Sequence, residues 1–227
     1  MSIGGTERLT VIIPSYHVKR ARNLEPLVRA CLRCSFVERV VVSNHNPKLR
    51  LVDWISVDDP RLQLLEEGRR HGCGHAWTIA AQLDADYFFV IDDDQLLNAS
   101  QLARLFRALV ADPEVPHGLC GERHGQYLER RAAEVDVLYN VYAVTRAHVD
   151  AFHARARELQ ASRHIRADEI EYFADDIIVS RCGNGLARIH DAGFVLRCRT
   201  GNQPGVAIFK EAGFADVRAR VSAALDA

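Results

Sequence analysis

The stretch Tyr87-Phe88-Phe89-Val90-Ile91-Asp92-Asp93-Asp94 places five apolar residues directly before three consecutive acids. The apolar residues are aromatic or β-branched and do not alternate with polar ones, which predicts a strand buried on both faces of a parallel or mixed sheet. The acids follow where this strand should end. Since α/β sheets bind ligands beyond the carboxyl ends of their strands, the stretch predicts a binding site in an α/β fold.

Three adjacent carboxylates indicate a bound cation. Their charged forms repel one another, and hard divalent ions such as Mg²⁺ and Mn²⁺ relieve that repulsion because they prefer oxygen ligands. Asp92, Asp93 and Asp94 therefore predict a site for Mn²⁺ or Mg²⁺ and for phosphate groups. The alternative is a solvated acidic loop that caps a helix beginning near Ser100. We favour the metal site because a buried strand positions the acids.

The composition is that of a folded globular chain. Of the 227 residues, 48% are hydrophobic and 26% are charged, which suffices for a sizeable core. The formal net charge of −1 gives no general attraction to nucleic acid or to an anionic membrane. The first residues do not resemble a signal peptide, and no apolar run has the length of a membrane span. We expect a cytoplasmic protein with no transmembrane segment and no nucleic-acid partner, and the oligomeric state stays open.

The six cysteines are expected to be reduced thiols, since nothing in the sequence indicates secretion. Cys31 and Cys34 form a C-x-x-C pair, and Cys73 with His71 and His75 could supply further zinc ligands. The C-x-x-C pair falls on a predicted helix, where small buried residues are common. We interpret these cysteines as packed thiols and keep a structural zinc as the alternative.

Strand and helix patterns alternate in the first half of the chain. The predicted strands are Leu9–Ile13, Val37–Ser43, Val52–Val57 and Leu62–Leu65. One predicted helix follows an N-cap at Asn23, a second contains Trp77, Ile79, Ala80 and Leu83, and a third spans Leu102–Val110. This alternation favours an α/β fold with a mixed, mostly parallel sheet flanked by helices.

The second half has a less regular pattern. Extended segments are predicted over Gly118–Leu128 and Val135–Val144, short strands over Leu186–His190 and Phe194–Cys198, a loop over Thr200–Gly205, and helices over Ala147–Leu159, from Asp168 onward and over Ala215–Leu225. No linker separates the halves, so we predict a single domain.

A second acidic site lies within the apolar segment Phe173-Ala174-Asp175-Asp176-Ile177-Ile178-Val179. Half-buried carboxylates need a partner or a ligand. We interpret Asp175 and Asp176 as part of the functional site. The alternative is a pair of helix acids neutralised by Arg181 or Arg166.

Four motifs occur in a characteristic order: Pro14-Ser15-Tyr16 after the first strand, Val41-Val42-Ser43-Asn44 at the end of the second, the three acids, and the late Asp175-Asp176-Ile177. This ordered set resembles metal-dependent glycosyltransferases of the GT-A fold, and is most similar to the exostosin-like group, whose members transfer sugars from UDP-sugars. The resemblance covers nearly the whole chain. It implies one Rossmann-like GT-A domain over residues 1–227, with a nucleotide-binding half at about 8–112 and an acceptor-binding half at about 113–227.

The resemblance also implies which residues hold the donor. Pro14, Ser15, Tyr16 and Asn44 would line the uracil and ribose site, and the segment from Arg70 to His75 would approach the nucleotide. Asp92 and Asp93 would hold the ribose and sugar side, Asp94 would bind the metal, and His190 is a second candidate metal ligand.

For the transfer itself, the resemblance places Tyr139 and Asn140 beside the acceptor, Asp176 near the anomeric carbon and Arg218 facing the diphosphate. A divalent ion would stabilise the charge on the leaving UDP, and a carboxylate such as Asp176 could stabilise the sugar cation, orient the acceptor or take its proton. The resemblance favours retention of configuration, and inversion stays open.

The function expected is therefore metal-dependent transfer of a sugar from a UDP-sugar to an unidentified acceptor. Two alternatives belong to other classes. An Asp-based phosphohydrolase could use Asp92 and Asp94, although such enzymes usually carry D-x-D on the first strand. A non-catalytic nucleotide-sugar binding module would bind UDP without turnover, and a fold alone does not exclude it.

Overall fold

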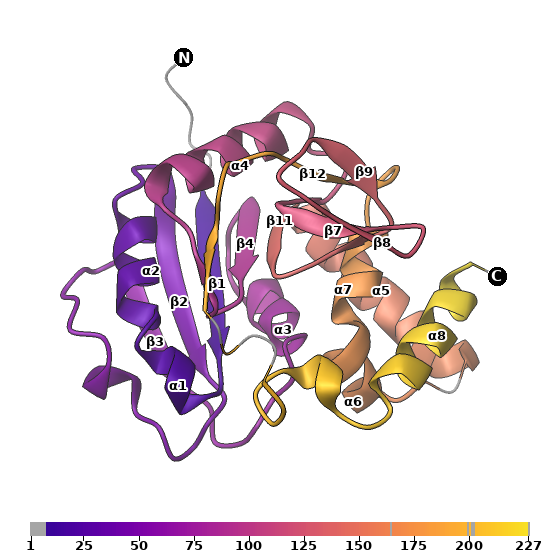
Figure 1. The fold of residues 1–227 in the computed structure, drawn as a ribbon, viewed down its shortest axis with the longest axis horizontal. Coiled ribbons are helices and arrows are strands. Elements are labelled where there is room, and N and C mark those ends of the chain that lie inside the picture. The colour runs from indigo at the N-terminus through magenta and orange to yellow at the C-terminus, as the bar shows by residue number, and fades with distance from the viewer. Residues whose placement is uncertain (1–7, 164, 199, 201–202, 227) are drawn as a thin grey trace.

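Strand β4 (Tyr87–Ile91) lies in the middle of a mixed sheet, with β1 (Leu9–Ser15) on one side and β11 (Val141–Thr145) on the other (Figure 1). The computed structural model describes residues 8–163, 165–198, 200 and 203–226. β4 is parallel to β1 and antiparallel to β11. With sheet neighbours on both edges, β4 is a central strand, as its continuous apolar sequence predicts.

The parallel part of the sheet continues beyond β1 with β2 (Val37–Asn44) and β3 (Leu62–Glu66). The chain runs from β1 through β2 to the edge at β3, and then crosses back to form β4 on the other side of β1. The strand order therefore reverses between β1 and β4. Open α/β sheets bind ligands at the carboxyl ends of the strands at such a reversal, so the fold itself marks this position.

The second half of the chain extends the same sheet with short strands. These are β6 (His117–Gly118), β12 (Ala187–Ile189) and β9 (Ala133–Val135), which complete the order β3-β2-β1-β4-β11-β6-β12-β9. A small separate sheet contains β10 (Val137–Leu138), β7 (Cys120–Arg123) and β8 (Gln126–Glu129). A two-stranded ladder pairs β5 (Gln95–Leu96), directly after the three acids, with β13 (Leu196–Arg197).

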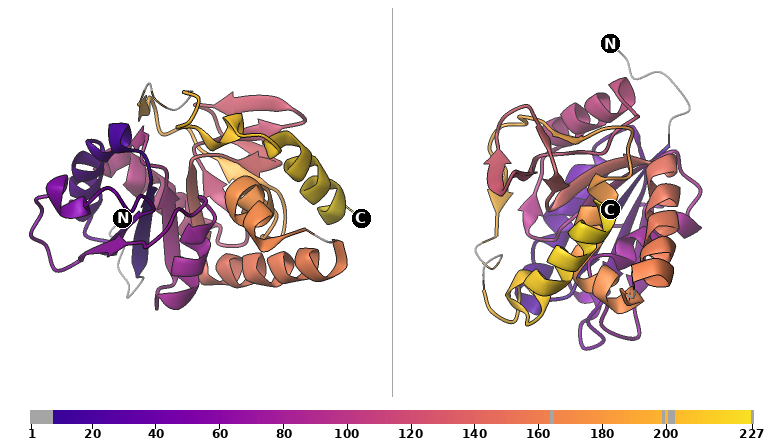
Figure 2. Two further views of the ribbon diagram at one scale, coloured as in Figure 1. Left: turned by 90° about the horizontal axis from the view of Figure 1, so that it is seen from below. Right: turned by 90° about the vertical axis from the view of Figure 1, so that its right-hand side faces the viewer.

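Helices cover both faces of the sheet (Figure 2). One face packs against α2 (Leu24–Leu32) and α4 (Ala99–Ala111), with α1 (Val18–Ala21) beside them. The other packs against α3 (His75–Gln82), α5 (Arg146–Arg163), α7 (Asp175–Ser180) and α8 (Phe214–Leu225). The shorter elements are η1 (Leu51–Asp53), α6 (Ala167–Glu169), the π-helical turn η2 (Ile170–Ala174) and η4 (Ile208–Lys210).

Adjacent residues of the central strands point to opposite faces of the sheet. In β1, Val11 and Ile13 belong to the core under α2 and α4, whereas Ile12 belongs to the core under α3 and α5. In β4, Phe89 and Phe88 divide in the same way. Because both faces are covered by helices, apolar side chains are needed at successive positions, which explains the continuous apolar runs in the sequence.

The predicted α/β fold with a mostly parallel sheet is confirmed, and several local predictions are wrong. Val52–Val57 is not a strand: the chain forms η1 and then runs without regular structure, with Val52 57% exposed. Glu66 stabilises this turn by accepting the backbone N–H of Leu51. The predicted extended segments are broken where His124 and Asn140 adopt positive φ angles of 50° and 65°.

Other predictions concern caps and cysteines. Asn98, and not an acid, caps α4 by accepting the backbone N–H of Gln101, so the acidic cluster is not a cap. Cys31 and Cys34 are buried free thiols in the core under α2, which agrees with packed thiols and gives no zinc cluster with Cys73 among the described residues. The loop predicted at Thr200–Gly205 includes residues 201 and 202, which lie outside the described residues. No helix in the described ranges is long and apolar enough to cross a membrane.

Candidate functional site

The ends of β1 and β4 are joined by a buried polar network, because these strands are parallel neighbours. Ser15 donates its hydroxyl to Asp93 Oδ2 over 2.8 Å. Arg20 in α1 donates from Nη1 to Asp93 Oδ1 over 3.0 Å, and its Nη2 lies 3.1 Å from Asp94 Oδ2. Burial raises the pKa of Asp93 to about 6, and the Arg20 charge opposes that rise. Both oxygens of Asp93 are therefore engaged within the protein.

Asn23 fixes the backbone of the same acidic turn. Its side-chain amide donates to the carbonyl of Asp93 over 2.9 Å. It does not cap α2, although it occupies the N-cap position that the sequence predicts. The start of the chain thus holds the acidic turn in two ways. Arg20 binds the carboxylates of Asp93 and Asp94, and the Asn23 side chain binds the backbone carbonyl of Asp93.

Asp92 and Asp94 line the cleft beyond β4. Gln95 donates to Asp94 Oδ1 over 2.7 Å. Burial, followed by the charge of Asp94, raises the pKa of Asp92 well above its ordinary range. Among the described residues, Arg20 is the cation that forms ion pairs with this turn, so three ionised acids would keep two net negative charges.

A divalent cation matches that excess charge. The donor set consists of carboxylate oxygens, which are the ligands that Mn²⁺ and Mg²⁺ prefer, so the residues present fit the predicted metal. The site also contains an unsatisfied donor: Arg20 Nε is buried and has no acceptor in the described part of the chain. Buried N–H groups normally have an acceptor, and an anionic ligand such as a phosphate could supply one.

Two adjoining hollows meet at the acidic turn. The smaller has a volume of about 170 Å³ and lies against the ends of β1 and β4. The larger has a volume of about 600 Å³ and extends to α7 and α8. Asp92, Asp94 and Asn140 line both hollows. A single extended ligand, or two ligands that react with one another, could therefore occupy them together.

Asn140 supports this junction through its backbone. Its carbonyl accepts the N–H of Asp92 over 2.9 Å, just after β4 ends. Its φ of 65° lies in the left-handed region, which asparagine tolerates better than most residues. The turn before β11 thus fixes the first acid, and Asn140 lines both hollows, while its place beside an acceptor stays a prediction.

The second acidic site lines the far side of the larger hollow. Asp176 accepts from Arg218 Nη1 over 2.5 Å and from the backbone N–H of Ile177 over 2.8 Å. Burial raises the pKa of Asp176, whereas the Arg218 charge lowers it. Asp175 accepts from Trp77 Nε1 over 3.1 Å, and burial together with Asp176 raises the pKa of Asp175 to about 7. The alternative pairing of these acids with Arg181 or Arg166 is wrong.

The donor-side residues are only partly where the sequence predicted them. Pro14, Ser15, Tyr16 and Arg70 line the smaller hollow, and the Arg70 guanidinium lies 4.7 Å from the centre of the Tyr16 ring. Asn44 does not line it. The Asn44 amide donates to the carbonyl of Leu49 over 2.6 Å and to Glu66, which ties β2 to the following loop.

The next residue, His45, lines the smaller hollow instead of Asn44. Two of the proposed residues lie outside both hollows. His75 stacks on His71, which lines the smaller hollow, with the two ring centres 3.7 Å apart. His190 lines a separate pocket and its Nε2 lies 2.7 Å from Nδ1 of His117, so the structure does not bring it together with Asp94.

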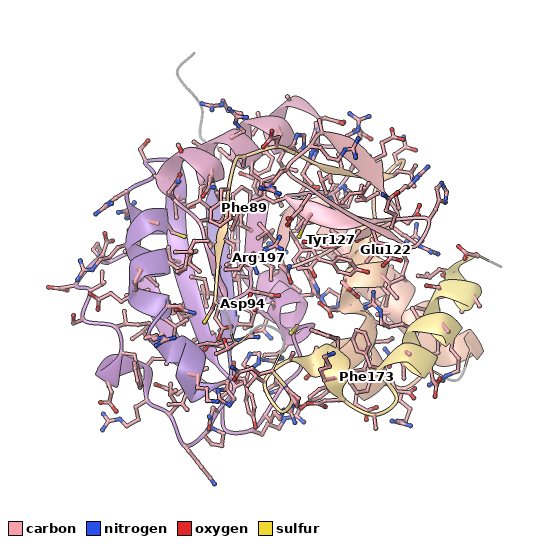
Figure 3. All side chains as sticks on the ribbon, viewed as in Figure 1. Phe89, Asp94, Glu122, Tyr127, Phe173 and Arg197 are labelled. Carbon is pink, nitrogen blue, oxygen red and sulfur yellow. The ribbon has the colours of Figure 1, made fainter. Side chains whose placement is uncertain are left out.

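Aromatic side chains that the sequence analysis did not single out line the larger hollow. Figure 3 labels two of them, Tyr127 and Phe173, together with Arg197 and Asp94, which line the same hollow. The rings of Tyr127 and Tyr139 are stacked with centres 6.3 Å apart, and Arg197 lies 5.9 Å from the Tyr127 ring centre. β13, which carries Arg197, reaches the site through its ladder with β5. No local sequence pattern indicates that pairing.

Among known proteins, solved structures have a fold similar to that of this chain. No family model matches the sequence, and no curated protein matches it. Two similar solved structures are residues 1–349 of TarS from S. aureus and GalNAc-T7 with UDP, GalNAc and Mn²⁺. TarS has a TM-score of 0.51 at 14% identity, over 83% of this chain and 59% of its own. GalNAc-T7 has a TM-score of 0.60 at 11% identity, over 95% of this chain and 48% of its own.

Both similar structures are glycosyltransferases, and this chain has the mixed α/β fold of GT-A glycosyltransferases. It spans 59% and 48% of the length of the two chains. At these identities the likeness describes the fold, and the function has to be argued from the site.

Proposed function

We propose that this chain is a metal-dependent glycosyltransferase that moves a sugar from a UDP-sugar to a hydroxyl acceptor. One observation carries the proposal: the acids that end β4 at the reversal of strand order share a cleft with the Asp176–Arg218 pair. One acidic site is suited to a cation and a diphosphate, and the other to the reacting sugar. The GT-A fold, and the UDP and Mn²⁺ in the GalNAc-T7 structure, support the same assignment.

The smaller hollow would bind the nucleotide. Tyr16 and His45 offer flat rings for a base, and Ser15 is held by Asp93 at the strand end. Arg20 and Arg70 supply positive charge for the diphosphate. Mn²⁺ or Mg²⁺ would be held by Asp94, with Asp92 beside it, and would stabilise the negative charge that the leaving diphosphate gains. The division into a nucleotide-binding half and an acceptor-binding half is part of this proposal.

Asp176 and Arg218 would act at the sugar. In the free protein the two charges neutralise one another at 2.5 Å. A diphosphate near Arg218 would compete for that guanidinium and leave Asp176 free to face the developing positive charge on the sugar. A carboxylate that faces the sugar cation in this way would have a stabilising or orienting role. This supports retention and the proposed place in the exostosin-like group.

The acceptor would bind in the larger hollow. Sugar rings present apolar C–H faces that pack on aromatic rings, and Tyr127, Tyr139 and Phe173 offer such surfaces. Arg197 and Arg218 add donors for hydroxyl or acidic groups of the acceptor. These features support a carbohydrate or a carbohydrate-like acceptor.

A thermal-shift measurement tests donor binding. UDP should raise the melting temperature more in Mn²⁺ than in EDTA, because a ligand of the folded state stabilises it by mass action. Asp94→Asn should abolish the difference, whereas Asp84→Asn, whose side chain is 87% exposed, should keep it. Equal shifts by UDP, ADP and GDP would leave only a phosphate site and remove the UDP-sugar assignment.

A further inference from the structure

A histidine–glutamate cluster borders the smaller hollow, which its member His71 lines together with the acidic turn. Glu67 follows β3, His71 lies in the next loop and His75 begins α3. One potential ligand atom from each of the three lies within 4.8 Å of the others, and Glu67 Oε1 is 3.3 Å from His75 Nε2. Two imidazoles and one carboxylate form a donor set found at zinc sites with three protein ligands, where water takes the fourth position.

The groups around the cluster orient its potential ligands. His71 Nδ1 lies 3.1 Å from Glu171 Oε1, and this hydrogen bond leaves Nε2 of His71 free to bind a metal. Ser43 donates its hydroxyl to Glu67 Oε1 over 3.2 Å. A carboxylate on the far nitrogen of a histidine is the usual partner of a metal-binding imidazole, because it fixes the ring and makes it more basic.

The backbone that carries the two histidines is fixed against η2. Gly74 donates its N–H to the carbonyl of Glu171 over 2.9 Å, and Gly72 donates to the Glu171 carboxylate over 3.0 Å. A Cβ on Gly72 would lie 2.2 Å from the Glu171 carbonyl oxygen, so glycine is required for this close approach. The loop that carries the cluster is therefore held in place by a residue about a hundred positions later in the sequence.

Access and charge are also suitable for a cation. The side chains of His71, His75 and Glu67 are 8%, 14% and 23% exposed, so the cluster is mostly buried but accessible to solvent and ions. His45 completes the wall, with its ring centre 5.5 Å from those of His71 and His75. Glu67 and Glu171 supply negative charge, and no arginine or lysine forms an ion pair with either among the described residues.

We propose that Glu67, His71 and His75 bind a divalent transition-metal ion of the zinc class at a site distinct from Asp94. The stacked imidazole rings rotate to direct a nitrogen lone pair from each at the ion, and water completes its coordination. Imidazole ligands favour Zn²⁺, Co²⁺ and Ni²⁺ over Mn²⁺ and Mg²⁺, so the two sites differ in metal preference. The bound ion fixes the loop from Glu67 to His75, which carries Arg70 into the smaller hollow.

Titration of the chelator-treated full chain with Co²⁺ tests the proposal. Visible absorption should report one tightly bound Co²⁺ per chain, which one equivalent of Zn²⁺ displaces. His71→Gln and His75→Gln should each remove the signal, and Glu171→Gln should weaken Zn²⁺ binding by about 10- to 100-fold, as for other partners of ligands. Asp94→Asn and His124→Gln should keep the signal. His124 is the matched control because its side chain is 80% exposed.

Folding of the variants is checked separately. In EDTA, His71→Gln and His75→Gln should have the circular dichroism spectrum of the parent chain, and only the parent should gain melting temperature on addition of Zn²⁺. The proposal is overturned if the parent chain binds no Co²⁺ or Zn²⁺. It is equally overturned if the correctly folded histidine variants bind as tightly as the parent, or if Asp94→Asn removes the signal.

Discussion

Replacing Asp175 with asparagine should stabilise the protein, and by more at pH 8 than at pH 5. Asp175 is 7% exposed, and burial together with the adjacent Asp176 raises the pKa of its carboxyl from 3.8 to about 7. Between pH 3.8 and about 7, Asp175 therefore keeps its proton in the folded chain but has lost it in the unfolded chain. Since the folded state then binds more protons, stability falls as the pH rises from about 4 to 7 and levels off above.

The magnitude follows from the difference between the two pKa values. One pH unit is worth about 1.4 kcal/mol, so a rise from 3.8 to about 7 gives a cost on the order of 4 kcal/mol at pH 8. At pH 5 the cost is about 1–2 kcal/mol. Asparagine carries no charge and keeps an oxygen that can accept the Trp77 Nε1 hydrogen bond of 3.1 Å. The Asp175→Asn variant should therefore regain most of the stability that the buried charge of Asp175 costs the parent chain.

Urea unfolding at pH 5 and pH 8, followed by circular dichroism, measures this gain. Asp168→Asn is the control: its side chain is 62% exposed, and hydrogen bonding to Arg166 lowers the pKa of Asp168. That substitution should change stability little at either pH. The reasoning is refuted if Asp175→Asn has the same effect on the free energy of unfolding at both pH values, or if it destabilises the protein at pH 8.

Three further substitutions test the packing around the site by urea unfolding. Gly72→Ala should lower the free energy of unfolding by about 1–3 kcal/mol or more, because the new Cβ would meet the Glu171 backbone. Gly68→Ala is the control, since a Cβ there meets nothing within 4 Å, and equal effects of the two substitutions would contradict this reasoning. Arg20→Met should cost about 3–5 kcal/mol by leaving two buried acids unpaired, and no loss would show that the network is not needed. Asn140→Ala should cost about 1 kcal/mol and Asn140→Gly less, because φ is 65°; the reverse order would be inconsistent.

The central strand and its acids could be predicted because the information is local. The apolar run from Tyr87 to Ile91 specifies a strand with covered faces, and the acids must follow it at the strand end. The sequence could not decide which residue at the end of β2, Asn44 or His45, lines the hollow. Successive residues near a strand end point in different directions, and here His45 lines the hollow while Asn44 bonds the loop.

Contacts between distant segments explain most of what the sequence analysis missed. Arg20 reaches the acids only because α1 lies over the end of β1, and no spacing in the sequence relates it to Asp93. Arg197 reaches the larger hollow through a two-residue ladder with β5, which is too short to leave a pattern. Glu67 was not connected with His71 and His75 because the loop that unites them is held by Glu171, about a hundred residues later.

Consumption of UDP-sugars by the purified chain tests the central proposal most directly. In Mn²⁺ one UDP-sugar of a panel should be converted with release of UDP, and EDTA or Asp94→Asn should stop the release. Asp176→Asn should reduce turnover by about 10²- to 10⁴-fold while it leaves UDP affinity nearly unchanged, because Asp176 is proposed to face the sugar. Release of UDP from no member of the panel, or wild-type turnover in Asp176→Asn, would contradict the proposed glycosyl transfer at this site.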